Sequence, residues 1–150
     1  MTGGAAGATL RGMVDVTAKN PPRDPRTLLS ALWVFAMFNY VYGDIVSLMD
    51  PALLPGFMAG QVGSIRMTPA FLFGAAVMME VPVAMTLLAR LLPPRPNRYA
   101  NLFAAAFKTL VVVATLFVDA PAAYYAFFSA VEIVTTVAIF VVALRWSVVA

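Results

Sequence analysis

The sequence predicts an all-α integral membrane protein, an antiparallel bundle of four spanning helices. Three observations predict this class. Hydrophobic residues make up 62% of the 150 residues and charged residues 11%, whereas about a quarter of a typical soluble domain is charged. The mean hydropathy is +0.87. The apolar residues gather in four stretches, each near the length of about 20 residues that a helix needs to cross a bilayer.

The four expected spans are joined by short connections. They cover residues 28–49, 69–92, 98–118 and 121–146. Residues 1–27 are rich in Gly, Ala, Pro and charge, which indicates a flexible cytoplasmic N-terminal tail. Residues 147–150 form a short C-terminal end. We therefore expect one membrane domain over residues 28–146, with no separate soluble domain.

The connection after the first span, residues 50–68, begins with Asp50-Pro51, which ends the helix. It contains Gly and Pro at several places and four apolar residues, Leu53, Leu54, Phe57 and Met58. A short helix lying at the membrane interface is the favoured interpretation, and a re-entrant loop is the alternative. The second connection is the PPRPNR turn, and Asp119 with Pro121 forms the third.

Basic residues indicate the orientation, because Lys and Arg are retained on the cytoplasmic side of a membrane. Eight of them lie on one side of the expected spans: Arg11, Lys19, Arg23, Arg26, Arg90, Arg95, Arg98 and Arg145. Arg66 stands alone on the other side, so we expect both termini in the cytoplasm. The basic residues form no patch with interleaved aromatic residues, which argues against nucleic acid as a partner. The lipid bilayer is the expected partner, and a homo-oligomer or a larger membrane complex stays open.

The chain contains no cysteine and no histidine. This inventory excludes disulfides, thiolate chemistry, a Cys/His zinc site and a Ser-His-Asp triad. We accordingly expect no cofactor, no metal site and no catalytic residue.

Six polar residues of the spans form the candidate binding or proton site: Glu132, Asp44, Tyr40, Lys108, Glu80 and Tyr125. With a rise of ~1.5 Å per residue, four of them fall in one central layer roughly 15 to 21 Å into the membrane: Tyr40, Glu80, Lys108 and Glu132. Asp44 and Tyr125 fall in a layer nearer the outside. Charged side chains at such depth are costly, and they often mark a functional site.

The central layer holds two glutamates and one lysine, so its charge sums to −1 if all three ionise. Either one Glu holds a proton, or a cation or donor-rich ligand completes the layer. Lys108 and Glu132 are the favoured pair, because the last two spans are joined by a tight turn and must be neighbours. The alternative is a purely structural pair that fixes how the helices pack. Glu80 also has a local structural use, since Pro82 leaves the carbonyl of Met78 without its helical partner.

Several local patterns recur in a fixed order between residues 29 and 146: LSALW, YVYGD, Pro82 followed by Met85, NRYAN, YYAFFSAVEIVTT and the closing AxxW. In their order and spacing, the chain resembles a bacterial family of four-transmembrane-helix proteins known by a domain-of-unknown-function label. The resemblance implies a four-helix protein of the bacterial cytoplasmic membrane and no particular activity. It also favours Tyr40, Asp44 and Glu132, because the family typically carries acids at the last two positions and apolar or aromatic residues at those of Glu80 and Lys108.

Three functions stay open. The favoured hypothesis is a small transport or permeation protein, or a subunit of one, whose intramembrane carboxylates bind a proton or cation. The first alternative is a non-catalytic accessory or scaffold subunit of a membrane complex. The second is a membrane enzyme that acts on a lipid or isoprenoid through Asp/Glu acid-base chemistry. It ranks last, because no metal set, nucleophile or phosphate-binding loop accompanies the acids.

Overall fold

The fold is mainly helical in the computed structural model, which describes residues 24–117 and 121–147. This part of the chain contains five helices and one two-stranded sheet: α2 (Pro25–Met49), α3 (Leu54–Met58), β1 (Gln61–Val62), β2 (Ile65–Arg66), α4 (Pro69–Leu91), α5 (Pro94–Thr115) and α6 (Ala123–Arg145). The expected all-α class is confirmed, with the small sheet as an addition. Most of the expected tail, the turn at Asp119 and the last three residues lie outside the described residues.

Three of the four long helices begin at prolines. Pro25, Pro69 and Pro94 each occupy the first helical position, where the missing N–H would have had no partner within the helix. Side-chain caps support two of these starts. Asp24 accepts a hydrogen bond from the backbone N–H of Arg26 at 3.2 Å, and Thr68 accepts one from the N–H of Phe71 at 3.2 Å.

The start of α5 differs from the expectation that residues 93–98 form a turn. The helix begins at Pro94 and includes Pro96. Both prolines lie in the first turn, whose N–H groups have no intrahelical acceptor, so neither interrupts the helix.

The connection between α2 and α4 contains the expected short helix, α3, and a β-hairpin that the sequence did not predict. In the hairpin, Gln61 pairs with Arg66 and Val62 with Ile65. Gly63 opens the two-residue turn with φ of 54°, a conformation that glycine adopts without steric cost. A strand of two residues is too short to show the alternation of apolar and polar side chains that predicts a strand. This explains why the sequence did not predict the hairpin.

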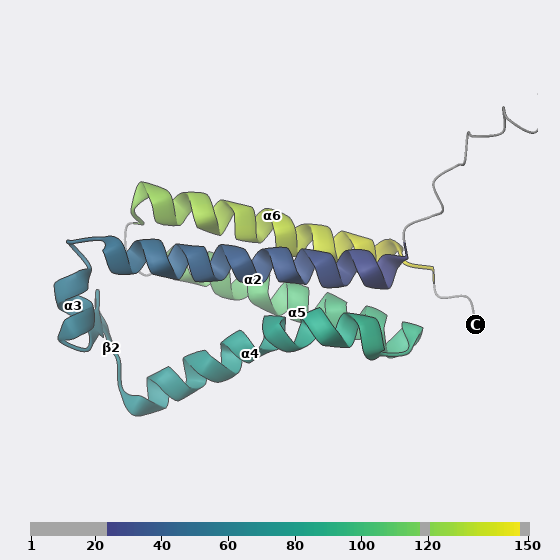
Figure 1. Cartoon of the computed structure of the whole chain (residues 1–150), viewed down its shortest axis with the longest axis horizontal. Coiled ribbons are helices and arrows are strands. Elements are labelled where there is room, and N and C mark those ends of the chain that lie inside the picture. The colour runs from purple at the N-terminus through teal and green to yellow at the C-terminus, as the bar shows by residue number, and fades with distance from the viewer. Residues whose placement is uncertain (1–23, 118–120, 148–150) are drawn as a thin grey trace, which may run out of the picture.

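The four long helices lie against one another, and successive ones run in opposite directions (Figure 1). Helix α6 packs against α2 and α5, whereas α4 packs mainly against α2. Helix α4 bends midway, and its first half diverges from the other helices (Figure 1). The interior proline of this helix is Pro82, which removes a backbone hydrogen bond and is a frequent cause of a bend. The buried residues of α4, namely Pro82, Met85 and Ala89, all belong to its second half.

The core is built on one face of α2. Its buried residues, Leu29, Trp33, Ala36 and Tyr40, follow steps of four, three and four residues, the spacing of a single helical face. Large apolar side chains elsewhere point outward, with Phe103 74% exposed and Val134 69% exposed. An apolar outer surface of this kind suits contact with lipid.

Within residues 24–117 and 121–147, three helices, α2, α4 and α6, are long and apolar enough to cross a membrane, while α5 is not among them. The chain is therefore compatible with a membrane protein.

Candidate functional site

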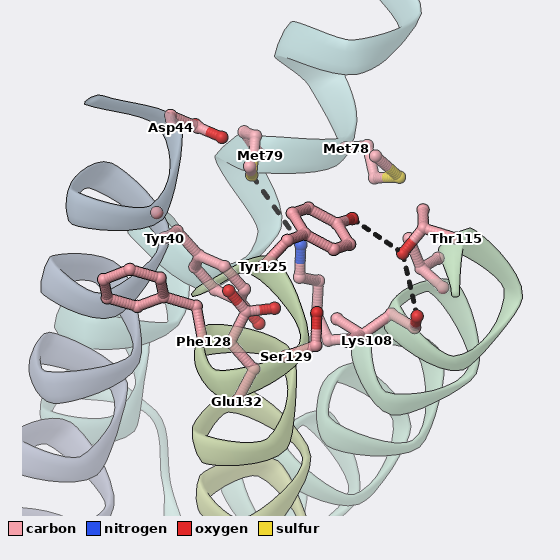
Figure 2. Close-up of a pocket in the computed structure, with 13 residues that line it drawn as sticks. Tyr40, Asp44, Met78, Met79, Lys108, Thr115, Tyr125, Phe128, Ser129 and Glu132 are labelled. Carbon is pink, nitrogen blue, oxygen red and sulfur yellow. Dashed lines mark hydrogen bonds between the residues drawn. The ribbon is translucent and has the colours of Figure 1, made fainter. Parts of the chain in front are cut away.

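One cavity of about 110 Å³ brings together five of the six candidate residues (Figure 2). They come from three helices: Tyr40 and Asp44 from α2, Lys108 from α5, and Tyr125 and Glu132 from α6. Helix α4 contributes Met78 and Met79 to the wall. Glu80 is exposed and does not line this cavity.

Helical spacing explains why these side chains meet. Tyr40 and Asp44 lie four residues apart on α2, so they share one face. On α6, Tyr125, Ser129 and Glu132 follow steps of four and three. The cavity lies between these faces and α4, just before the bend at Pro82, where α4 diverges from the other helices (Figure 1).

Lys108 is 2% exposed, and its ammonium makes direct contact with two soft, uncharged groups while sharing the cavity with Asp44 and Glu132. The Nζ atom lies 4.3 Å from the centroid of the Tyr40 ring and 3.7 Å from the sulfur of Met79. The ring contact is a cation–π interaction, and a thioether is a weak acceptor. Lys108 and Glu132 line the same cavity, as the sequence suggested, but no hydrogen bond joins them in the described part of the chain.

The carboxylates keep most of their hydrogen-bonding capacity free. Glu132 is half-buried and accepts one hydrogen bond, from the amide of Asn39 to Oε1 at 3.3 Å. Asn39 also donates to the carbonyl of Phe128 at 3.0 Å, which fixes its side chain. Asp44 is exposed. A carboxylate has about four lone-pair sites, so both acids have room for a further donor or cation.

The two tyrosines of the cavity differ in their hydrogen bonds. Tyr125 donates to the hydroxyl of Thr115 at 3.1 Å, and Thr115 in turn donates to the carbonyl of Val112 at 2.8 Å. The hydroxyl of Tyr40 is buried and has no hydrogen-bond partner among the described residues. A buried hydroxyl without a partner is unfavourable, which makes Tyr40 a candidate contact for a ligand.

Sequence reasoning missed Asn39 and Met79. Asn39 is next to Tyr40 in the sequence, beside the helix face that carries Tyr40 and Asp44. Its amide within an apolar stretch was the feature of the sequence that could have indicated it. Met79 gave no signal, because a thioether in an apolar span normally serves packing.

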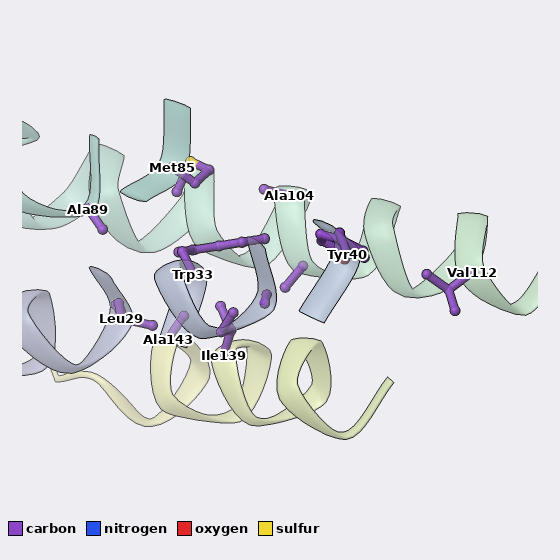
Figure 3. Close-up of a cluster of buried hydrophobic side chains, with 11 residues drawn as sticks. Leu29, Trp33, Tyr40, Met85, Ala89, Ala104, Val112, Ile139 and Ala143 are labelled. Carbon is purple, nitrogen blue, oxygen red and sulfur yellow. The ribbon is translucent and has the colours of Figure 1, made fainter. Parts of the chain in front are cut away.

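A second polar cluster lies at the other end of the helices and is fully hydrogen bonded. Trp33 Nε1 donates to Oδ1 of Asn101 at 2.8 Å. The amide of Asn101 donates to Oδ1 of Asn97 at 2.7 Å, and the amide of Asn97 donates to the carbonyl of Ala89 at 2.7 Å. These side chains are completely buried, and Figure 3 shows Trp33 and Ala89 within the surrounding apolar core. We call Trp33, Asn97 and Asn101 the closed cluster; it links α2, α5 and α4.

A further cavity of about 350 Å³ lies between α5 and α6. Its wall is formed by Ala106, Thr109, Leu110, Val113, Val137 and Phe140. The hydroxyl of Thr109 is already bonded to that of Thr136 at 2.7 Å. In the described part of the chain no charged group lines this cavity, so the charged cavity is the stronger candidate for ion or proton chemistry.

Fold and site together define a class: a mainly helical protein, compatible with the membrane, with a charged cavity among four helices. The chain belongs to a family of unknown function, DUF6326, whose model matches residues 21–149. This confirms the resemblance to a family of unknown function. No curated protein and no solved structure matches the chain.

Proposed function

We propose that the chain is a four-span protein of the bacterial cytoplasmic membrane that binds a proton or cation in its charged cavity and serves transport or permeation. One observation carries this proposal. Two carboxylates with free acceptor capacity share a cavity with a buried ammonium that has no anionic hydrogen-bond partner among the described residues.

Helix α5 serves as the fourth span in this proposal, although its sequence is less apolar. Its 22 residues reach roughly 33 Å at the rise of an α-helix, close to the thickness of the hydrocarbon core. The two polar residues in the middle of the helix that reduce its average hydropathy, Asn101 and Lys108, are buried inside the molecule, and the arginines that reduce it further, Arg95 and Arg98, lie in its first turns. Its outward residues include Phe103 and Leu110, which are 74% and 68% exposed. The face toward lipid is therefore apolar.

The distribution of charge supports the proposed orientation. Four arginines lie at the end of the bundle where α4 and α6 finish and α5 begins: Arg90, Arg95, Arg98 and Arg145. With this end in the cytoplasm, the charged cavity lies toward the outer half of the membrane. Asp44 then lies nearer the outer surface than Glu132, and a cation entering from outside meets it first.

The charges of the cavity leave a place for one positive charge. Asp44 and Glu132 contribute −2 and Lys108 contributes +1 when all are ionised. A proton or a monovalent cation neutralises the remaining charge, which matters because an unbalanced charge in a low-dielectric environment is costly.

The direct test is a flux assay in proteoliposomes that contain an internal pH dye, with Na⁺, K⁺ or tetramethylammonium gradients imposed across the membrane. We expect the wild-type protein to dissipate or generate a pH gradient with at least one of these cations. Glu132→Gln should abolish this flux while the protein remains folded by circular dichroism and gel filtration. Glu80→Gln is the matched control, because it makes the same chemical change at an exposed side chain outside the cavity.

The outcomes separate the proposed function from its alternative. A scaffold gives no flux from correctly folded wild-type protein, and that result would reject the proposal. Equal loss of flux in both glutamine variants would show that the cavity is not the site.

A further inference from the structure

We infer that the charged cavity selects a small organic monocation, of the alkylammonium type, over an inorganic metal ion. The inference rests on the proposed function, because it names the class of ligand for the same site. It depends on the chemistry of the wall, the charge and the size of the cavity.

The wall carries the groups that bind organic cations. Tyr40, Tyr125 and Phe128 supply aromatic side chains, and Met78 and Met79 supply thioethers. Aromatic faces attract ammonium groups more strongly when water is excluded, and thioethers are soft and polarizable.

The molecule already contains an example of such an interaction. The ammonium of Lys108 lies 4.3 Å from the Tyr40 ring centroid and 3.7 Å from the Met79 sulfur. The wall therefore stabilises an alkylammonium group in the structure itself. A ligand ammonium would use the same kinds of contact, together with Glu132 and the unpartnered hydroxyl of Tyr40.

The donor set is less suited to a metal ion. Calcium and magnesium prefer six or more oxygen ligands in a compact shell, and thioethers are poor ligands for such hard cations. The two carboxylates of the cavity come from different helices, α2 and α6. Among the described residues, no group of three or more His, Cys, Asp or Glu is arranged to hold a metal ion.

The size and charge of the cavity set limits on the ligand. A volume of about 110 Å³ is well above the roughly 10–15 Å³ that a single water needs, so a ligand of a few heavy atoms fits. The net charge of −1 matches a single positive charge. Lys108 competes with this ligand, because its ammonium contacts the same wall.

The experiment measures thermal stabilisation and calorimetric binding of the purified full-length protein in detergent. The probes are methylammonium, tetramethylammonium, Na⁺ and K⁺ as chlorides, compared at equal ionic strength. We expect the ammonium ions to raise the melting temperature in a saturable way. Na⁺ and K⁺ should raise it no further than the ionic strength alone does.

Four variants test the wall. Tyr40→Phe keeps an aromatic face and should keep binding of tetramethylammonium, whereas Tyr40→Leu should weaken it on the order of tenfold. Met79→Leu retains the volume without the sulfur and should weaken binding several-fold, which provides a second test if Tyr40→Leu does not fold. Lys108→Met removes the competing charge and should tighten binding on the order of tenfold.

Three results would overturn the inference. Stabilisation by Na⁺ or K⁺ equal to that by the ammonium ions would reject organic-cation selectivity and leave the proposed function standing. Unchanged affinity in both Tyr40→Leu and Met79→Leu would reject the aromatic and thioether wall as the site. No binding of any probe, together with no flux in proteoliposomes, would reject both the inference and the proposed function.

Discussion

The closed cluster and the charged cavity are two polar regions built from the same helices, and they differ in how completely their groups are paired. Trp33 and Tyr40 lie on the same face of α2, seven residues apart. The N–H of Trp33 has a good acceptor on Asn101 at 2.8 Å, whereas the hydroxyl of Tyr40 has no partner in the described structure. Fully paired buried groups stabilise a fold, while incompletely paired ones need an explanation. The contrast separates a structural cluster from a candidate site.

The bend in α4 accounts for the difference. Its second half packs onto the closed cluster, where the carbonyl of Ala89 accepts the amide of Asn97. Its first half diverges before Pro82 (Figure 1) and leaves the cavity beside Met78 and Met79. Pro82 therefore lies between the three paired side chains of the closed cluster and the cavity, where the hydroxyl of Tyr40 has no partner among the described residues.

The largest expected effect follows from Asn101→Leu in the closed cluster. This change leaves the N–H of Trp33 and a carbonyl oxygen of Asn97 buried without partners. We expect a loss of about 3 kcal/mol in the free energy of unfolding, measured by denaturant titration in mixed micelles. Cation binding by the folded fraction should be unchanged. A loss below about 0.5 kcal/mol, the size of an ordinary surface substitution, would contradict a structural role for the cluster.

A smaller effect of opposite sign is expected from the double variant Lys108→Met/Glu132→Gln in the cavity. The ammonium is buried against an aromatic ring and a thioether, so its desolvation is incompletely compensated. The double variant removes one positive and one negative charge, so the net charge of the cavity is unchanged, and it should stabilise the protein by about 1–2 kcal/mol. Lys108→Met alone should be less stable than the double variant, because it leaves two carboxylates without a counter-charge. The same unfolding titration checks this value. Marked destabilisation would instead support the structural pair with Glu132.

Pro82→Ala tests whether the bend in α4 maintains the cavity. Alanine restores the N–H that can bond to the carbonyl of Met78, so we expect α4 to straighten. The free energy of unfolding should rise by about 1 kcal/mol, which is a fraction of the destabilisation that a proline causes inside a helix. Tetramethylammonium affinity should fall several-fold, because the cavity narrows. Unchanged affinity in the variant would show that the bend does not maintain the cavity.

The smallest effect is expected from Glu80→Gln. Glu80 is exposed and lies outside both polar regions, so the free energy of unfolding should change by less than about 0.5 kcal/mol. A larger change, read in the same titration, would reveal a partner for Glu80 such as the carbonyl beside Pro82.

Local sequence pattern was sufficient to place the long helices, because apolar stretches, caps and prolines act within a few residues. It also grouped Tyr40, Asp44, Lys108, Tyr125 and Glu132, since helical spacing and depth are local quantities. It could not predict that Lys108 contacts Tyr40 and Met79 rather than Glu132, or that Glu80 lies outside the cavity. Those contacts depend on the direction in which α4 bends and on how the helices rotate, which only tertiary packing determines.

The most direct measurement is the reactivity of single cysteines placed in the two regions, which needs no background removal because the chain has no cysteine. Val111→Cys places a thiol at a half-buried position in the wall of the cavity, and Ala105→Cys places one in the buried core. We expect a water-soluble cationic methanethiosulfonate to modify the Val111 variant in the native protein, faster than its anionic counterpart does. The Ala105 variant should react only after denaturation. Equal protection of both thiols in the native state would show that the cavity is closed, and would contradict its assignment as a cation site.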